Sequence, residues 1–321
     1  LTFHADTIMQ QNTVALTGGT VRYRSGAGGL TLGEGAAVDV KGNTDVAGGN
    51  VVLASEGLLT IAAGATVDVS AGVQGDAGSI AVSAPEASVG LFGEMRGAAD
   101  GGQGGRLALD AAGIQAAAQG SGNAFSDLNG ILATGGFDET MDLRLRDQDI
   151  LIASDQVVRV RSFKLVTDKG RLEVAGTIDA SGAASGGSIA LHAGGDQLAL
   201  TATGLLDASG GTDGAYGGDI YLEAANGVHI QNGARLDLSA GGGDGMGGTV
   251  HFRVPRTTAD DGVRMTVDGG AIAGAAAVGV EGYRVYEANT VNAAAMGPWR
   301  THATDFMIHE TAMRSSIRDR L

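Results

Sequence analysis

Aspartates recur at similar steps along the 321-residue chain and could act together. Asp179, Asp207 and Asp237 are 28 and 30 residues apart, and a serine stands two residues after each of them. If equivalent positions stack about 5 Å apart, the carboxylates form a ladder whose repulsion must be relieved by water, salt or a cation. We interpret the ladder as a solvated face that opposes aggregation. Weak cation binding is the sharper alternative, although three carboxylates supply few of the roughly six to eight oxygens that calcium prefers.

Basic residues gather in one segment of a chain whose formal net charge is −15. Such a group could bind an anionic glycan, because clustered positive charge attracts polyanions. Aspartates interleave with these residues, however, so salt bridges are the interpretation that we favour. The candidate anionic-ligand patch consists of Arg144, Arg146, Arg159, Arg161 and Lys164.

Residue types that support catalysis or cofactor binding are few. The chain has no cysteine, which excludes a thiol nucleophile and thiolate metal sites. Its six histidines show no His-x-x-x-His spacing, and no Gly-Lys-Ser/Thr follows a glycine run. Cleavage of a glycan needs clustered acids in a groove lined by aromatics, yet aromatics make up 4% of the chain. We therefore predict a non-enzymatic protein with no catalytic residues, metal ligands or cofactors.

Two phrases that repeat in fixed order would position the charged side chains. One is a short alternating strand that carries an acid, such as Thr177–Ser181, and the other is a glycine pair that starts a second strand. Gly187, Gly218 and Gly248 close such pairs and are 31 and 30 residues apart. Period-two alternation indicates strands, and a repeat of this length indicates stacked units. We therefore predict an all-β fold, a right-handed parallel β-helix (β-solenoid), with a short C-terminal α-helix.

Inward aliphatic side chains would hold such a stack together. Ile189, Ile220 and Val250 occupy equivalent positions in three successive units and should form one apolar column. Burying each of them contributes roughly 1.5–3 kcal/mol. Between Ile150 and Leu172 the step shortens to 22 residues, which predicts a tighter unit without a long glycine loop.

Two segments depart from the repeat and define the expected domain organisation. Residues 116–139 are the least repetitive, and we expect a loop or a short helix that projects from the β-helix. Near the end, Met313, Ile317 and Leu321 share one helical face, with N-cap candidates at Thr304 and Asp305. We therefore predict β-helix repeats over residues 1–290 and a linker with a helix over 291–321.

The composition also excludes two classes of partner. The acidic net charge argues against nucleic acid, since phosphate binding requires clustered positive charge. The uncharged apolar stretch near Gly269–Val280 is shorter than the roughly 20 residues of a membrane span. The chain opens at Leu1 without a charged and apolar leader, so we expect a piece of a longer or processed protein.

The strand phrases also carry a family likeness. They are Thr13–Tyr23, Thr177–Gly182, Gly247–Arg256, the Gly-Gly-x-Ile-x-Leu strand starts and the Phe306–Met307 segment. These stretches resemble the very large filamentous haemagglutinin-like exoproteins of Gram-negative bacteria. The likeness covers most of the chain and is weakest over residues 116–139.

The resemblance implies a right-handed β-helical fibre that is exported through an outer-membrane secretion partner, as in two-partner secretion. It also implies a secreted or cell-surface adhesin of a Gram-negative bacterium, although the family's N-terminal secretion signature is not visible here. The expected partner is a host or bacterial surface glycan or protein, with self-association as a further option. A glycan-active β-helix, such as a polysaccharide lyase or a tailspike-like depolymerase, and a purely architectural filament remain alternatives.

Overall fold

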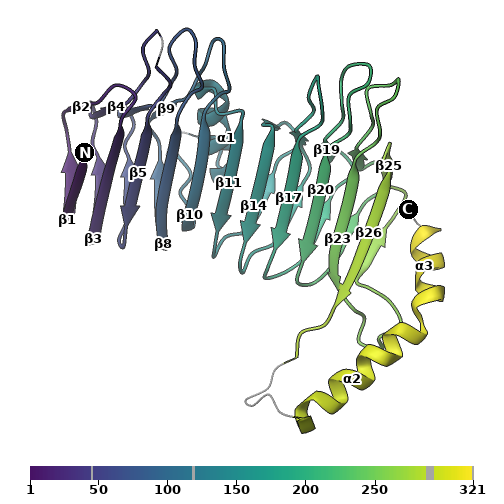
Figure 1. Cartoon of the computed structure of the whole chain (residues 1–321). Coiled ribbons are helices and arrows are strands. Elements are labelled where there is room, and N and C mark those ends of the chain that lie inside the picture. Colours follow the sequence, from purple (N-terminus) through teal and green to yellow (C-terminus); the bar gives the residue numbers. More distant parts are fainter. Residues whose placement is uncertain (45, 118–119, 287–292, 320–321) are drawn as a thin grey trace.

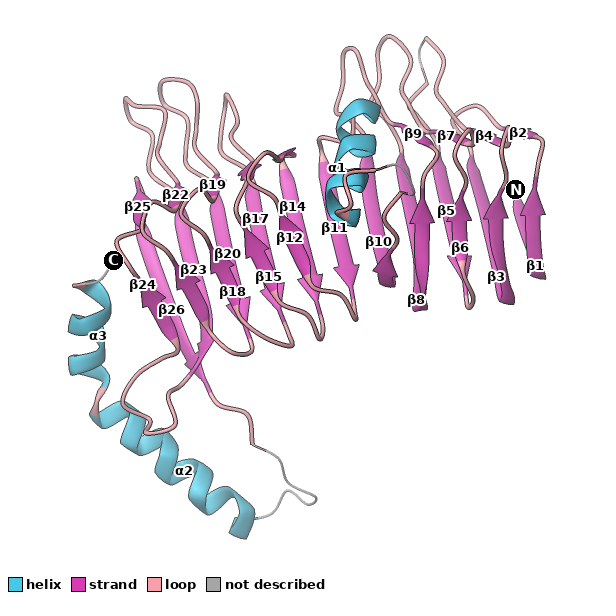
Figure 2. Ribbon diagram, turned by 180° about the vertical axis from the view of Figure 1, so that it is seen from behind, coloured by secondary structure: helices cyan, strands magenta, loops and turns pink. Residues whose placement is uncertain are grey.

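The chain folds as a stack of parallel β-strands that is followed by two helices (Figures 1 and 2). The computed structural model describes residues 1–44, 46–117, 120–286 and 293–319. Strands form most of its regular structure, and the strands of each sheet pair in parallel. The prediction of a mostly β chain is confirmed.

One long sheet runs through the whole stack and takes one strand from each repeat. It has 12 strands, of which β6 (Leu59–Ile61) lies off the main path and pairs with β3 and β8. The strands on the main path are β1 (Thr2–Gln10), β3 (Thr20–Leu32), β5 (Asn50–Ser55), β8 (Ser79–Leu91), β10 (Arg106–Ile114), β11 (Thr140–Leu145), β14 (Ser162–Thr167), β17 (Ser188–Ala193), β20 (Asp219–Ala224), β23 (Thr249–Pro255) and β26 (Ala277–Tyr283).

Three shorter sheets complete the repeats. The first is β2 (Thr13–Ala15), β4 (Ala37–Asp39), β7 (Thr66–Asp68) and β9 (Glu94–Arg96). The second is β12 (Ile150–Ile152), β15 (Leu172–Val174), β18 (Leu198–Leu200), β21 (Val228–Ile230) and β24 (Met265–Val267). The third is β13 (Val157–Arg159), β16 (Thr177–Asp179), β19 (Leu205–Asp207), β22 (Arg235–Asp237) and β25 (Ala271–Ala273).

The register of the strands follows the sequence repeat. Ile189 pairs with Ile220, and Ile220 pairs with Val250, so the predicted apolar column is confirmed. All three side chains are buried in the core. Ile150 and Leu172 are also direct partners, which confirms that the 22-residue step is one complete repeat. Successive repeats therefore cover one another's apolar side chains.

Glycine closes each glycine pair because the main chains of successive repeats approach closely there. A Cβ on Gly187 would lie 1.9 Å from the carbonyl oxygen of Arg161, and one on Gly218 would lie 2.0 Å from that of Gly187. The corresponding distance from Gly248 to the Gly218 oxygen is 1.8 Å. Real Cβ atoms do not come so near to an oxygen, so a side chain at these positions would push the repeats apart.

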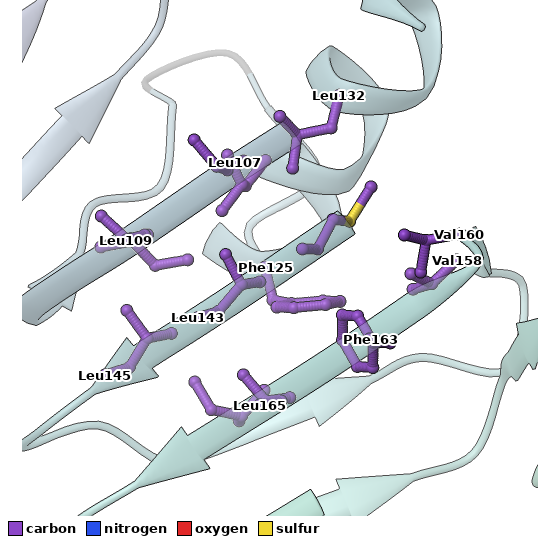
Figure 3. Packing of buried hydrophobic residues seen from close by; sticks show 14 of the residues in the cluster. Leu107, Leu109, Phe125, Leu132, Leu143, Leu145, Val158, Val160, Phe163 and Leu165 are labelled. Atoms are coloured by element: carbon purple, nitrogen blue, oxygen red, sulfur yellow. The ribbon is translucent and has the colours of Figure 1, made fainter. Parts of the chain in front are cut away.

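Helix α1 (Ala124–Gly135) replaces a strand in the middle of the stack. It contacts β9 on one side and β12 and β13 on the other, and therefore separates the first short sheet from the other two. Phe125, Leu128 and Leu132 are buried in the core. Figure 3 shows Phe125 and Leu132 among the side chains of β10, β11 and β14. The expected short helix is present at residues 124–135, but it does not project, because its apolar face fills the interior.

Local sequence sets the ends of α1. The Asn123 side chain accepts hydrogen bonds from the main-chain N–H groups of Phe125 and Ser126 at 3.0 and 3.3 Å, as an N-cap does. At the other end Gly136 adopts a left-handed conformation with φ of 77°, which glycine tolerates without steric cost. The helix consequently starts and stops within the space of one repeat.

The C-terminal segment forms two helices, α2 (Ala293–Ile308) and α3 (Glu310–Arg318), and not the single helix predicted. The predicted N-caps are wrong, because Thr304 and Asp305 lie inside α2. The Met313 side chain is buried and that of Ile317 is half-buried, while Leu321 lies outside the described residues. Helix α2 is held to the last repeats by Arg256, which lies 4.8 Å over the Phe306 ring and donates to the His302 carbonyl oxygen at 3.2 Å.

We predict opposite outcomes for two substitutions in adjacent strands. Ile220→Asp places a carboxylate in the apolar column and should lower the free energy of unfolding by several kcal/mol, about 2–7. Asp207→Asn should be nearly neutral, because an amide oxygen can still accept the hydrogen bonds from Ser209. Urea titrations of both variants measure the difference. Equal destabilisation by the two substitutions would contradict the assignment of Ile220 to the interior and of Asp207 to the outward side of the strand.

Candidate functional site

The predicted aspartate ladder is present, and each aspartate is hydrogen-bonded within the turn that follows its own strand. Asp179, Asp207 and Asp237 are direct register partners in β16, β19 and β22. One carboxylate oxygen of each accepts the main-chain N–H of the serine two residues later, at 3.1, 2.9 and 3.0 Å respectively. The Asp-x-Ser phrase therefore fixes the bend after each strand.

Arginines relieve the repulsion within this ladder. Arg159 approaches Asp179 at 3.5 Å, and Arg235 binds Asp237. Burial tends to raise the pKa of Asp237, but its hydrogen bonds to Ser239 and the charge of Arg235 outweigh that effect and lower it. Within the described residues, no group of three or more histidine or acidic side chains is arranged to hold a metal ion. The geometry favours a structural ladder over a cation site.

The five basic residues of the candidate anionic-ligand patch do not form one site. Arg144, Arg146 and Lys164 lie on the long sheet or directly after it, whereas Arg159 and Arg161 lie in and after β13. Four of the five have an acidic partner. The pairs are Arg144–Asp168 at 2.8 Å, Arg146–Asp110 at 2.7 Å, Arg159–Asp179 at 3.5 Å and Lys164–Asp142 at 3.2 Å. Salt bridges thus neutralise most of the patch, and Arg161 alone of the five has no ion pair among the described residues.

The Arg146–Asp110 pair links two repeats with good geometry. The Nε and one terminal nitrogen of Arg146 donate to the two carboxylate oxygens of Asp110 at 2.7 and 2.8 Å. These hydrogen bonds and the positive charge lower the pKa of Asp110. The pair therefore stabilises the fold only while Asp110 is ionised.

A charged and aromatic network on the outer face of the long sheet was missed by the sequence reasoning. Glu223 accepts from the Tyr221 hydroxyl at 2.9 Å and lies 3.2 Å from Nδ1 of His192. Arg253 binds Glu223 and also donates to Glu281 at 3.2 Å. Sequence position could have revealed this network, because His192, Glu223 and Arg253 each stand five residues after the second glycine of their pair and so occupy equivalent positions.

The network holds Glu223 in its ionised form. Burial tends to raise the pKa of Glu223, but Tyr221, His192 and Arg253 together outweigh burial and lower it. Burial and the hydrogen bond to Glu223 raise the pKa of Tyr221 to about 12, so the phenol stays protonated. Its ring stacks on that of His251, with centroids 5.4 Å apart. This cluster can offer hydrogen bonds and charge, but Glu223 is not poised to donate a proton at neutral pH.

An apolar cavity lies between the last repeat and the C-terminal helices. Its volume is about 940 Å³, and its lining is mainly aliphatic, including Ile272, Val280 and Met313. Among its described lining residues, the charged groups all lie on α3, where Glu310 and Arg314 pair with each other at 2.7 Å. The described lining contains none of the candidate site residues, although Met313 and Ile317, which the sequence places on one helical face, both belong to it.

Comparison with known proteins gives no relative for the chain. No protein-family model matches it, and neither does any curated protein or solved structure. Among the described helices, none is long and apolar enough to cross a membrane. The site must therefore be interpreted from its own geometry.

We predict that calcium does not stabilise the chain specifically. Each ladder aspartate already binds its serine, so calcium should raise the melting temperature no more than sodium chloride of equal ionic strength does. Differential scanning fluorimetry in both salts measures this. A calcium-specific rise that disappears when all three aspartates are replaced by asparagine would establish the cation site instead.

Removal of the Asp110 carboxylate should reveal a pH-dependent contribution. The folded-state pKa is lowered, so the stabilisation is present above the unfolded value of about 3.9 and is lost as the pH falls through the folded value. Asp110→Asn should lower the melting temperature by about 1–2 °C at pH 7, and by less at pH 3. If Asp110→Asn lowered the melting temperature equally at both pH values, the ion pair would not be the cause of the destabilisation.

Proposed function

We propose that the chain is a structural segment of a secreted or cell-surface bacterial adhesin-like exoprotein, and that it mediates attachment to a surface or a cell. In this proposal the stacked strands form a right-handed parallel β-helix. The chain reaches the surface through an outer-membrane secretion partner. It contacts a host or bacterial surface glycan or protein, or another copy of itself.

The observation that carries the proposal is the uninterrupted parallel ladder of the long sheet from β1 to β26. A repeating stack of this kind positions side chains along an extended face without requiring a conformational change. The apolar side chains of each repeat are buried between its neighbours, so outward positions can vary without loss of the fold. Such a scaffold suits a protein that presents a surface, and the resemblance of its strand phrases to filamentous haemagglutinin-like exoproteins points the same way.

The outward ion pairs support the same interpretation. Arg144–Asp168, Lys164–Asp142 and Lys169–Asp147 each link neighbouring repeats across the outside of the stack. Individually such exposed pairs contribute little to stability. Their main effect is that the outer surface carries charged groups of both signs side by side, without a large region of one sign, which limits nonspecific association.

We predict that the folded chain binds to cells. Latex beads coated with the chain should attach to cultured epithelial cells or to Gram-negative bacteria several times more often than albumin-coated beads, and soluble chain should compete. The matched control is a bead coated with Ile220→Asp, which carries the same surface residues on a destabilised fold. Attachment that does not exceed the albumin level with any cell type would refute the proposal.

A glycan-active enzyme is the second candidate, and the Glu223 network favours it. Two carboxylates, Glu223 and Glu281, flank Arg253 on the outer face, and the Tyr283 ring lies 4.6 Å from that guanidinium. Glycan cleavage commonly uses two carboxyl groups, one of which must be protonated. The lowered pKa of Glu223 opposes that role. Release of new reducing or unsaturated ends from a panel of polysaccharides, abolished by Glu223→Gln, would establish the enzyme over the adhesin.

A further inference from the structure

The long loops of the repeats are interrupted once, beside α1. Long connections follow β4, β7 and β9 at residues 41–48, 70–77 and 97–105, and follow β16, β19 and β22 at 181–187, 209–217 and 239–247. Between these two sets, the connections at 136–139 and 160–161 are short. Figures 1 and 2 show the two sets of loops along one edge of the molecule, with α1 between them. The one tighter repeat that the sequence predicts and the repeat that contains α1 together leave a break in this edge.

The break is a polar cleft of about 670 Å³, which we call the notch. One wall is the loop with Ala99, Gly102 and Gly104, the floor includes Asp138 and Arg161, and Ser181 stands on the other wall. The flanking loops belong to repeats that are three spacings apart, about 14 Å between chain centres. The notch therefore has the width of about two extended chains.

The middle of the notch wall has main-chain groups without a main-chain partner among the described residues, whereas its ends are bound: Gly97 and Gly105 donate to the carbonyl oxygens of Gly135 and Gly136 at 2.7 and 2.9 Å. On the side away from the notch, the loop pairs with its neighbour, as when the Ala71 N–H donates to the Ala98 carbonyl oxygen at 2.9 Å. Within the described part of the chain, Ala99, Gly102 and Gly104 make no main-chain hydrogen bond. An open main-chain edge of this kind can be completed by an extended segment of another polypeptide.

The charges of the notch match a polypeptide better than a polyanion. Arg161 is held in place by its main chain, which donates to the Asp138 carbonyl oxygen at 2.7 Å and accepts from Ser188 at 2.9 Å. Its guanidinium has no ion pair among the described residues and can receive a carboxylate. Asp138 and Glu139, also without ion pairs there, can accept N–H groups. Because Asp179 lines the cleft with Arg159 as well, acids exceed bases by one, and a polyanion such as a sulfated glycan would be repelled.

The lining also argues against a compact organic ligand. Pockets for such ligands are lined mainly by apolar and aromatic side chains. No aromatic ring lines the notch, and its described lining is glycine, alanine, one valine and polar side chains. The small side chain of Ala99 leaves that part of the wall accessible to another main chain, whereas the Asp138 carboxylate packs against Gly104.

We propose that the notch binds an extended polypeptide segment, which pairs with the main chain of the 97–105 loop and places an acidic side chain on Arg161. The segment takes the place of the long loops that are missing at the connections 136–139 and 160–161. This inference rests on the proposed attachment function and locates the surface that would contact a protein partner.

The test starts with phage-displayed random linear dodecapeptides selected on the folded chain. The best peptide is then synthesised with a fluorophore and titrated by anisotropy. We expect enrichment of peptides with aspartate or glutamate. Arg161→Glu should weaken binding about tenfold or more, because a charge-assisted hydrogen bond is replaced by repulsion. Arg22→Glu is the matched control, since Arg22 is exposed on β3 and has no ion pair among the described residues.

A second variant fills the notch. It carries a copy of residues 210–216 inserted between Val160 and Arg161, which restores a long loop to a tight repeat. The same peptide should then show no measurable binding, while the melting temperature stays close to that of the unmodified chain. In the unmodified chain, peptide binding should slow amide hydrogen exchange at residues 98–104.

Three results would overturn the inference. They are no enriched peptide, a peptide that binds the filled variant or Arg161→Glu as well as it binds the unmodified chain, or notch-dependent binding of neutral oligosaccharides in place of peptides. The cell-attachment assay remains separate. If the filled variant still attaches to cells, attachment uses another surface. If the peptide binds the notch but no cell is bound, the attachment function fails and the notch stands.

Discussion

The close approach of main chains between successive repeats is the constraint on which the rest of the structure depends. Parallel strands must lie about 4.8 Å apart to pair. At the start of β17, β20 and β23 the chain comes so near to the preceding repeat that only glycine fits, as at Gly218. That spacing puts Ile220 over Ile189 and Asp207 over Asp179. The apolar columns, the aspartate ladder and the ion pairs between repeats all follow from it.

The same constraint explains which segments can differ from one repeat to the next. A repeat must supply a strand to the long sheet, but its other segments can change provided that the interior is filled. Helix α1 illustrates this, because Phe125 and Leu132 occupy the core where a strand would otherwise lie. Loops outside the stack are freer still, and their shortening around 136–139 and 160–161 creates the notch. Such a scaffold would acquire a binding surface by changing its loops while the long sheet stays the same.

Much of the fold could be predicted from the sequence repeat. The segments that depart from the repeat could not. The partners of Asp179, Ile189 and Ile150 follow from sequence spacing alone. The burial of α1 was also accessible in principle, since Phe125, Leu128 and Leu132 have helical spacing after the Asn123 cap. The boundary between α2 and α3 at His309 has no glycine or proline to mark it. Ion-pair partners such as Asp168 for Arg144 were hidden because they depend on which face each strand turns outward.

The most direct test of the account is the distance between spin labels placed on equivalent outward positions of different repeats. The chain has no cysteine, so Asn50→Cys can be combined in turn with Ser188→Cys, Asp219→Cys or Thr249→Cys and labelled specifically. These strands are five, six and seven steps from β5 along the long sheet. Double electron–electron resonance should give distances of about 24, 29 and 34 Å, rising by one strand spacing each time. Distances that do not increase in this order would contradict the stacked parallel repeat.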